Sequence, residues 1–224
     1  MYGVVRIMGY LRLERIYNLR SLSCLKTLRE VTGYVYIGYN SALSSAELPA
    51  LTKVGEDFSL HFNTALAGIS APMLSSAGSL YFLGLDRLTS VSAPALTSLG
   101  SLRIQSNPKL DVLSLPALAS VQTFARILNN KAIRGIALPL LMTIGQHLDV
   151  QGNDGLTAIS TDSLKRIGRG LEVHSNARLS GYDGMPALAC VGPGGEKNSL
   201  SDCSQDFKQR VAAASTAWST PACS

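Results

Sequence analysis

The chain has 224 residues, of which 46% are hydrophobic and 6% aromatic, and its formal net charge is +5. This hydrophobic content is ordinary for a folded protein and argues against disorder. The positive charge is spread along the chain without the basic run that binds nucleic acid or anionic lipid, so no nucleic-acid partner is expected. No stretch approaches the ~18 uninterrupted apolar residues of a membrane span, so no span is expected either.

The first residues already belong to a repeating pattern. Ile7–Leu13 matches Val31–Ile37 at an offset of 24 residues. Residues 1–20 carry four arginines and a glutamate, which is not the pattern of a secretory signal peptide. Because a bare solenoid end exposes core and strand edge, terminal coils normally carry a cap. We therefore expect that the chain opens within a coil, without its N-terminal cap, as a fragment or a misassigned start would.

The pattern recurs every 22–24 residues and can be aligned on an asparagine. The anchors are Asn40, Asn63, Asn107, Asn130, Asn153 and Asn176, with Leu85 in the place between Asn63 and Asn107. An apolar pair stands five and three residues before each anchor, as in Leu102 and Ile104. Alternation of inward apolar and outward polar residues predicts a short strand at this place in every unit. A fixed period in this range is typical of a solenoid.

Glycine, asparagine and proline punctuate each unit. Most units begin with a glycine, which fits a tight corner with a positive φ angle: Gly33, Gly55, Gly78, Gly100, Gly145 and Gly168. The amide of the anchor asparagine can bond to the backbone of the next coil, so we expect stacked copies to form a ladder. A proline marks a further corner, where its missing N–H is not needed.

These features predict a mostly β fold, a right-handed leucine-rich β-solenoid of about eight coils with parallel sheets. The solenoid is expected to span residues 1–192, and residues 193–224 to form a C-terminal cap or tail. The composition turns alanine-rich around Gln205–Trp218, where Phe207, Val211 and Trp218 could lie against the open end of the last coil. A short capping helix is therefore expected there.

Three of the four cysteines cluster where the repeat ends. Cys190, Cys203 and Cys223 lie in the last 35 residues, whereas Cys24 lies in an early coil. Such clustering favours a disulfide-stapled cap and an oxidising compartment. The alternative is four free thiols in a cytosolic repeat protein. The sequence leaves open which cysteines pair and whether the remaining one pairs with Cys24.

The repeat unit resembles the receptor L-domain family of leucine-rich solenoids, which includes the ligand-binding L domains of insulin and epidermal growth factor receptors. Residues 25–37 look like the receptor version. Asn107–Leu110 followed by Leu115–Leu118 looks like the repeats of fungal GPI-anchored cell-wall proteins and bacterial surface proteins. The similarity covers about residues 4–192. It implies an extracellular or cell-surface protein, without enzymatic activity, that binds a ligand or organises a cell wall.

The chain departs from this family in three ways. It has no signal peptide, no hydrophobic C-terminal anchor tail and no Asn-x-Ser/Thr glycosylation site. An intracellular or prokaryotic leucine-rich-repeat scaffold for protein–protein interaction therefore remains the alternative.

Catalytic and metal-binding patterns are lacking in the sequence. His61, His147 and His174 occupy outward strand positions and read as solvent-facing side chains, without cysteines or carboxylates at metal-ligand spacing. There is no Gly-x-Ser-x-Gly elbow, and Gly192–Lys197 lacks the spacing of a phosphate loop. We expect no enzyme, no cofactor and no metal.

Two outward columns run along the predicted sheet and carry the candidate binding face. The first column is Arg12, Tyr36, Ser59, Tyr81, Arg103, Arg126, Asp149 and Glu172, and the second column is Glu14, Gly38, His61, Leu83, Gln105, Leu128, Gln151 and His174. We expect Tyr36, Tyr81, Leu83, Arg103, Arg126 and Leu128 to form an aromatic and basic face for a protein or glycan ligand. The alternative is an ordinary solvated sheet face, on which Arg126 simply pairs with Asp149.

Overall fold

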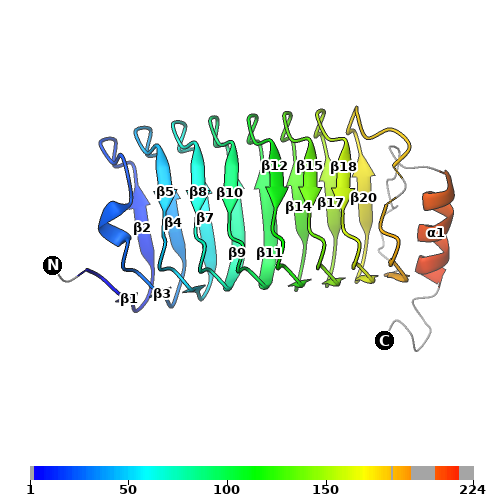
Figure 1. Ribbon diagram of the computed structural model, residues 1–224, viewed down its shortest axis with the longest axis horizontal. Helices are drawn as coiled ribbons and strands as arrows, with labels where there is room; N and C mark the ends of the chain where they lie inside the picture. Colours follow the sequence, from blue (N-terminus) through cyan, green and yellow to red (C-terminus); the bar gives the residue numbers. More distant parts are fainter. Residues whose placement is uncertain (1–2, 183, 193–204, 217–224) are drawn as a thin grey trace.

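The computed structural model is a β-solenoid whose coils stack in a row, with one helix at the C-terminal end (Figure 1). It describes residues 3–182, 184–192 and 205–216, and within the last range it describes side chains only up to residue 213. The predicted mostly β solenoid of about eight turns with parallel sheets and a short C-terminal helix is confirmed.

The largest sheet has fifteen strands and carries the outward columns. Its main strands are β2 (Leu11–Glu14), β4 (Val35–Gly38), β7 (Asp57–His61), β9 (Ser76–Leu83), β11 (Ser98–Gln105), β14 (Ala125–Leu128), β17 (Leu148–Gln151) and β20 (Leu171–His174). Every neighbouring pair is parallel, and both predicted columns are confirmed residue by residue in the register. The sequence therefore predicted which side chains lie next to one another along this face.

Shorter strands complete each coil. The ones joined to the large sheet are β1 (Arg6–Ile7), β3 (Glu30–Val31), β6 (Lys53–Val54), β13 (Ser120–Val121), β16 (Thr143–Ile144), β19 (Arg166–Ile167) and β21 (Cys190–Val191). Two three-stranded sheets form another side: β5 (Ser45–Glu47), β8 (Gly68–Ser70) and β10 (Ser90–Ser92), then β12 (Val112–Ser114), β15 (Gly135–Ala137) and β18 (Ala158–Ser160). A 3-10 turn, η1 (Ser23–Leu25), lies near the N-terminal end.

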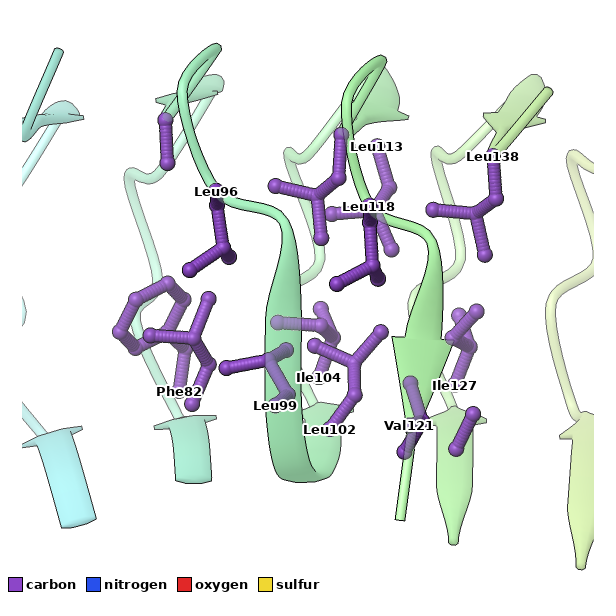
Figure 2. Close-up of a cluster of buried hydrophobic side chains, with 14 of the residues drawn as sticks. Phe82, Leu96, Leu99, Leu102, Ile104, Leu113, Leu118, Val121, Ile127 and Leu138 are labelled. Atoms are coloured by element: carbon purple, nitrogen blue, oxygen red, sulfur yellow. The ribbon is translucent and has the colours of Figure 1, made fainter. Parts of the chain in front are cut away.

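The interior is a continuous stack of aliphatic side chains. In the central coils Phe82, Leu102, Ile104 and Ile127 point inward and meet the side chains of adjacent coils (Figure 2). All four are at most 1% exposed. Because each coil shares its apolar contacts with its neighbours, no coil is a separate folding unit.

The anchor asparagines are all buried and join successive coils. The backbone N–H of Asn40 donates to Oδ1 of Asn63 at 2.9 Å, and Nδ2 of Asn63 donates to the carbonyl of Ile37 at 2.8 Å. The same bonds recur down the column, so the expected ladder forms, but each side chain bonds to the backbone of the preceding coil and not to that of the next coil. Toward the next coil, Nδ2 of Asn107, Asn130 and Asn153 donates to the side chain of the following anchor. At Leu85 the ladder is interrupted, because an alkyl side chain offers no acceptor to the coil before it.

The corner glycines correct a prediction. None of the six has a positive φ angle; instead, a Cβ at these places would crowd the backbone of the preceding coil. At Gly145, for example, it would overlap the carbonyl oxygen of Gln122. Glycine is needed here for close approach between coils, not for an unusual backbone angle.

The predicted capping helix is α1 (Gln205–Thr216), packed beside β21 at the end of the solenoid (Figure 1). Phe207 and Val211 are buried as expected, and the Phe207 ring meets Tyr182 edge to face with centroids 5.7 Å apart. Trp218 lies outside the described residues. The helix thus covers apolar surface that the last coil would otherwise expose.

The cysteines are only partly described. Cys190 is buried in β21 and is not a free thiol, whereas Cys24 is free and exposed. Cys203 and Cys223, the candidates for pairing with Cys190, lie outside the described residues. The predicted pairing among these three cysteines therefore stays a prediction.

Candidate ligand-binding face

Arginine side chains of the first column stack on aromatic rings. The guanidinium of Arg12 lies over the Tyr36 ring at 4.8 Å from its centroid, and that of Arg103 lies over Tyr81 at 4.9 Å. These contacts follow from the register, because Arg12 pairs with Tyr36 and Arg103 with Tyr81 on adjacent strands. Arg126 makes the same contact with Phe124, at 4.6 Å. Cation–π stacking of this kind holds each arginine in one orientation.

A histidine fills the gap between the two tyrosines. The ring of His61 meets Tyr36 with centroids 5.2 Å apart and Tyr81 with centroids 4.4 Å apart, both edge to face. Burial, and then the charge of Arg103, lowers the pKa of His61, and its Nε2 atom has no hydrogen-bond partner in the described structure. His61 is thus a neutral side chain packed between the rings of Tyr36 and Tyr81, not the solvent-facing histidine that we expected.

Five of the six predicted ligand-binding residues are placed together with partly exposed side chains: Tyr36, Tyr81, Leu83, Arg103 and Arg126. The sixth, Leu128, is only 9% exposed and so offers little surface to a ligand, and its role in ligand contact stays a prediction. It lies between Gln105 and Gln151 in the register. Strands only ~4.8 Å apart allow long side chains to cover a shorter one between them, which explains the burial.

Charge changes sign along the first column. Arg103 lies beside Arg126, then follow Asp149 and Glu172. Arg126 and Asp149 do not form the ion pair that we considered; the Arg126 Nε and the Asp149 Oδ1 are both buried without a hydrogen-bond partner in the described structure. Burial and then the charge of Glu172 raise the pKa of Asp149, although Gln151 and Arg126 oppose this shift. The first column is therefore basic and aromatic in coils one to six and acidic beyond them, while Glu14 of the second column forms ion pairs with Arg12 and Arg15 in the first coil.

A third column beside the second one was missed in the sequence. The residue before each anchor, and before Ile16 at the same place in the first coil, lies in the left-handed region, with φ between 52° and 67°. We call these residues the left-handed column: Arg15, Tyr39, Phe62, Gly84, Ser106, Asn129, Gly152 and Ser175. Gly84 and Gly152 are the signal that could have revealed it, because glycine favours such angles.

Two adjacent members of this column are large and exposed. Tyr39 and Phe62 are 39% and 40% exposed, and their rings stack with centroids 5.2 Å apart at an angle of 26°. Arg15 lies over the other side of Tyr39, 5.3 Å from the ring centroid. We call Tyr39 and Phe62 the aromatic shelf.

A shallow polar hollow of about 440 Å³ lies on the turns that follow the left-handed column, lined by Ser41, Thr64, Ala65, Asp86, Arg87 and Lys109. Among the described residues, the hollow included, no group of three or more histidine, cysteine or acidic side chains could hold a metal ion. Within the same residues, no helix is long and apolar enough to span a membrane.

Comparison with known proteins adds no family assignment. No protein-family model matches the chain, and no curated protein matches it either.

Proposed function

We propose that this protein is a non-enzymatic recognition module that binds a protein or carbohydrate ligand through the outward face of its long parallel sheet. The observation that carries the proposal is the set of three arginine–aromatic stacks on adjacent or nearby strands. Arginine and aromatic residues are the types most enriched at binding hot spots. Stacking on the rings, together with the hydrogen bonds from Arg12 Nε to Glu14 and from Arg103 Nε to Gln105, favours one orientation of these two guanidinium groups before a ligand binds.

The proposed location is outside the cell or at its surface. The resemblance to receptor L domains and the cysteine cluster at the C-terminal end support it. The alternative is an intracellular or prokaryotic scaffold, which the free and exposed Cys24 favours. Intact mass before and after reduction separates the two, since a disulfide adds two hydrogens when it is reduced. No change in mass would contradict the disulfide-stapled cap.

The binding proposal is tested by the double variant Tyr81→Ala/Arg103→Ala against a glycan array and a displayed protein library. We expect ligands of the wild-type protein to lose on the order of thirtyfold or more in affinity, because two central contacts are removed. Arg134→Ala is the matched control, since Arg134 precedes β15 on another side of the solenoid and should bind as wild type. Equal affinity of the double variant for every ligand found would refute this role of the face.

A further inference from the structure

The aromatic shelf has a backbone conformation that bulky residues rarely adopt. Tyr39 and Phe62 have φ angles of 58° and 52°, in the left-handed region where a side chain crowds its own backbone. Other coils of the same chain place Gly84, Ser106 and Asn129 at the equivalent position. The solenoid therefore does not require an aromatic residue here. Strained, exposed residues of this kind are concentrated at binding sites.

The neighbourhood of the shelf is rich in positive charge. Arg103 lies two strands beyond Phe62, and none of the ion pairs among the described residues includes it. The polar hollow beside the left-handed column adds Arg87 and Lys109 against the single acid Asp86. A partner with carboxylates near apolar groups would complement this surface.

The orientations of the aromatic rings favour a polypeptide ligand over a carbohydrate ligand. The faces of Tyr39 are turned toward Phe62 on one side and Arg15 on the other, and Arg12 and Arg103 cover faces of Tyr36 and Tyr81. A sugar ring that stacks on an aromatic residue needs an open ring face. Exposed ring edges suit the aliphatic and aromatic side chains of a polypeptide instead.

We infer that the aromatic shelf and Arg103 together bind an acidic polypeptide segment, whose apolar side chain packs against Tyr39 and Phe62 while a neighbouring carboxylate bonds to Arg103. This inference rests on the proposed function and narrows its ligand to a polypeptide. It also places the main apolar contact outside the two columns that the sequence predicted.

The test is selection from a phage-displayed library of random peptides on the intact protein, with a glycan array in parallel. We expect enriched peptides to carry aspartate or glutamate beside an apolar residue. They should bind the variant Tyr39→Asn/Phe62→Asn on the order of thirtyfold more weakly. The asparagines tolerate the left-handed angle, as Asn129 does at φ 57°, so the variant should keep its fold and its circular dichroism spectrum.

Two controls accompany this variant. Ser175→Asn makes the same kind of change in the last coil of the left-handed column and should bind peptide as wild type. Arg103→Gln should bind more weakly and show less loss of affinity as salt is raised, because it removes the charge that attracts the carboxylate.

The outcomes separate the inference from the proposed function. Enriched peptides without acidic residues, or peptides that bind the shelf variant as tightly as wild type, overturn the inference and leave the binding module intact. Glycan binding without peptide enrichment does the same. If neither library yields a ligand that depends on this face, both the inference and the proposed function fail.

Discussion

Asn107 illustrates how one side chain connects three coils. Its Oδ1 accepts from the backbone of Leu85 at 3.1 Å and its Nδ2 donates to the carbonyl of Phe82 at 3.2 Å, while its own N–H donates to Asn130 at 3.1 Å. The residue is fully buried. A buried amide without such partners costs about 1–3 kcal/mol, so both bonding groups must be placed correctly. The repeat length of the sequence provides that placement in every coil except the first and the fourth, where Ile16 and Leu85 take the place of the asparagine.

Asp149 is the clearest ionisable residue to test by substitution. Its pKa is raised above 3.8 by burial and by Glu172, so ionised Asp149 disfavours the folded state at neutral pH. We expect Asp149→Asn to increase the free energy of unfolding at neutral pH. The difference should disappear as the pH falls below 3.8, where the wild-type carboxyl is protonated in both states. Urea denaturation at the two pH values measures this.

Asp111 provides a control with the opposite sign. A hydrogen bond from Arg134 lowers the pKa of Asp111, so its ionised form favours the folded state above 3.8 and this contribution is lost as the pH falls. Asp111→Asn should therefore slightly decrease the free energy of unfolding at neutral pH, since an exposed pair contributes little. If Asp149→Asn is also less stable than wild type there, the attraction of Arg126 outweighs burial and the interpretation of Asp149 is wrong.

At the scale of the element, the corners of the coils control how closely strands stack. We expect Gly145→Ala to lower the free energy of unfolding by about 3 kcal/mol or more, because the new methyl group overlaps the Gln122 carbonyl and must separate two coils. Thermal or urea unfolding measures the loss.

Gly135→Ala is the matched control within the same part of the solenoid. A Cβ at Gly135 would lie 3.9 Å from Val112, at an ordinary van der Waals distance, and its φ angle is not positive. Stability close to that of wild type is expected. Equal losses for the two alanine variants would contradict close contact between coils as the reason for glycine at position 145.

At the scale of the whole molecule, the solenoid is a linear array in which each coil contacts its neighbours. Removal of residues 108–130 deletes one period, since Asn107 and Asn130 are 23 residues apart and equivalent. We expect the shortened protein to fold cooperatively, with a urea m-value lower by roughly an eighth, because m follows the surface exposed on unfolding.

Removal of residues 108–119 is the contrasting deletion, because it does not remove a whole period. This deletion ends within a coil and brings inward positions of one coil against corners of the next. It should abolish the cooperative transition. A shortened protein that folds equally well after either deletion would contradict the dependence on whole periods.

The C-terminal end shows what an array of this kind needs beyond its repeats. Phe207 and Val211 on α1 cover the last coil, and Arg210 donates to the carbonyl of Gly184 at 3.2 Å. The helix was predicted from composition because alanine-rich sequence with spaced apolar residues differs from the period of the coils. The described part of the helix, Gln205–Thr216, lies within the predicted range.

By itself the sequence determined the solenoid, its strand register and the neighbours in both outward columns, because burial alternates with a period that each coil repeats. The sequence located the corner glycines, but the prediction that they adopt positive φ angles was wrong. Only the tertiary structure decided three details of the face: Leu128 is buried, His61 packs between two tyrosine rings, and Arg126 does not form an ion pair with Asp149. They depend on how side chains of different coils share the space between strands, which no single repeat contains. The exposed pair of Tyr39 and Phe62 also depends on the stacking of coils, because residues with the same left-handed backbone angle in adjacent coils lie side by side on the surface.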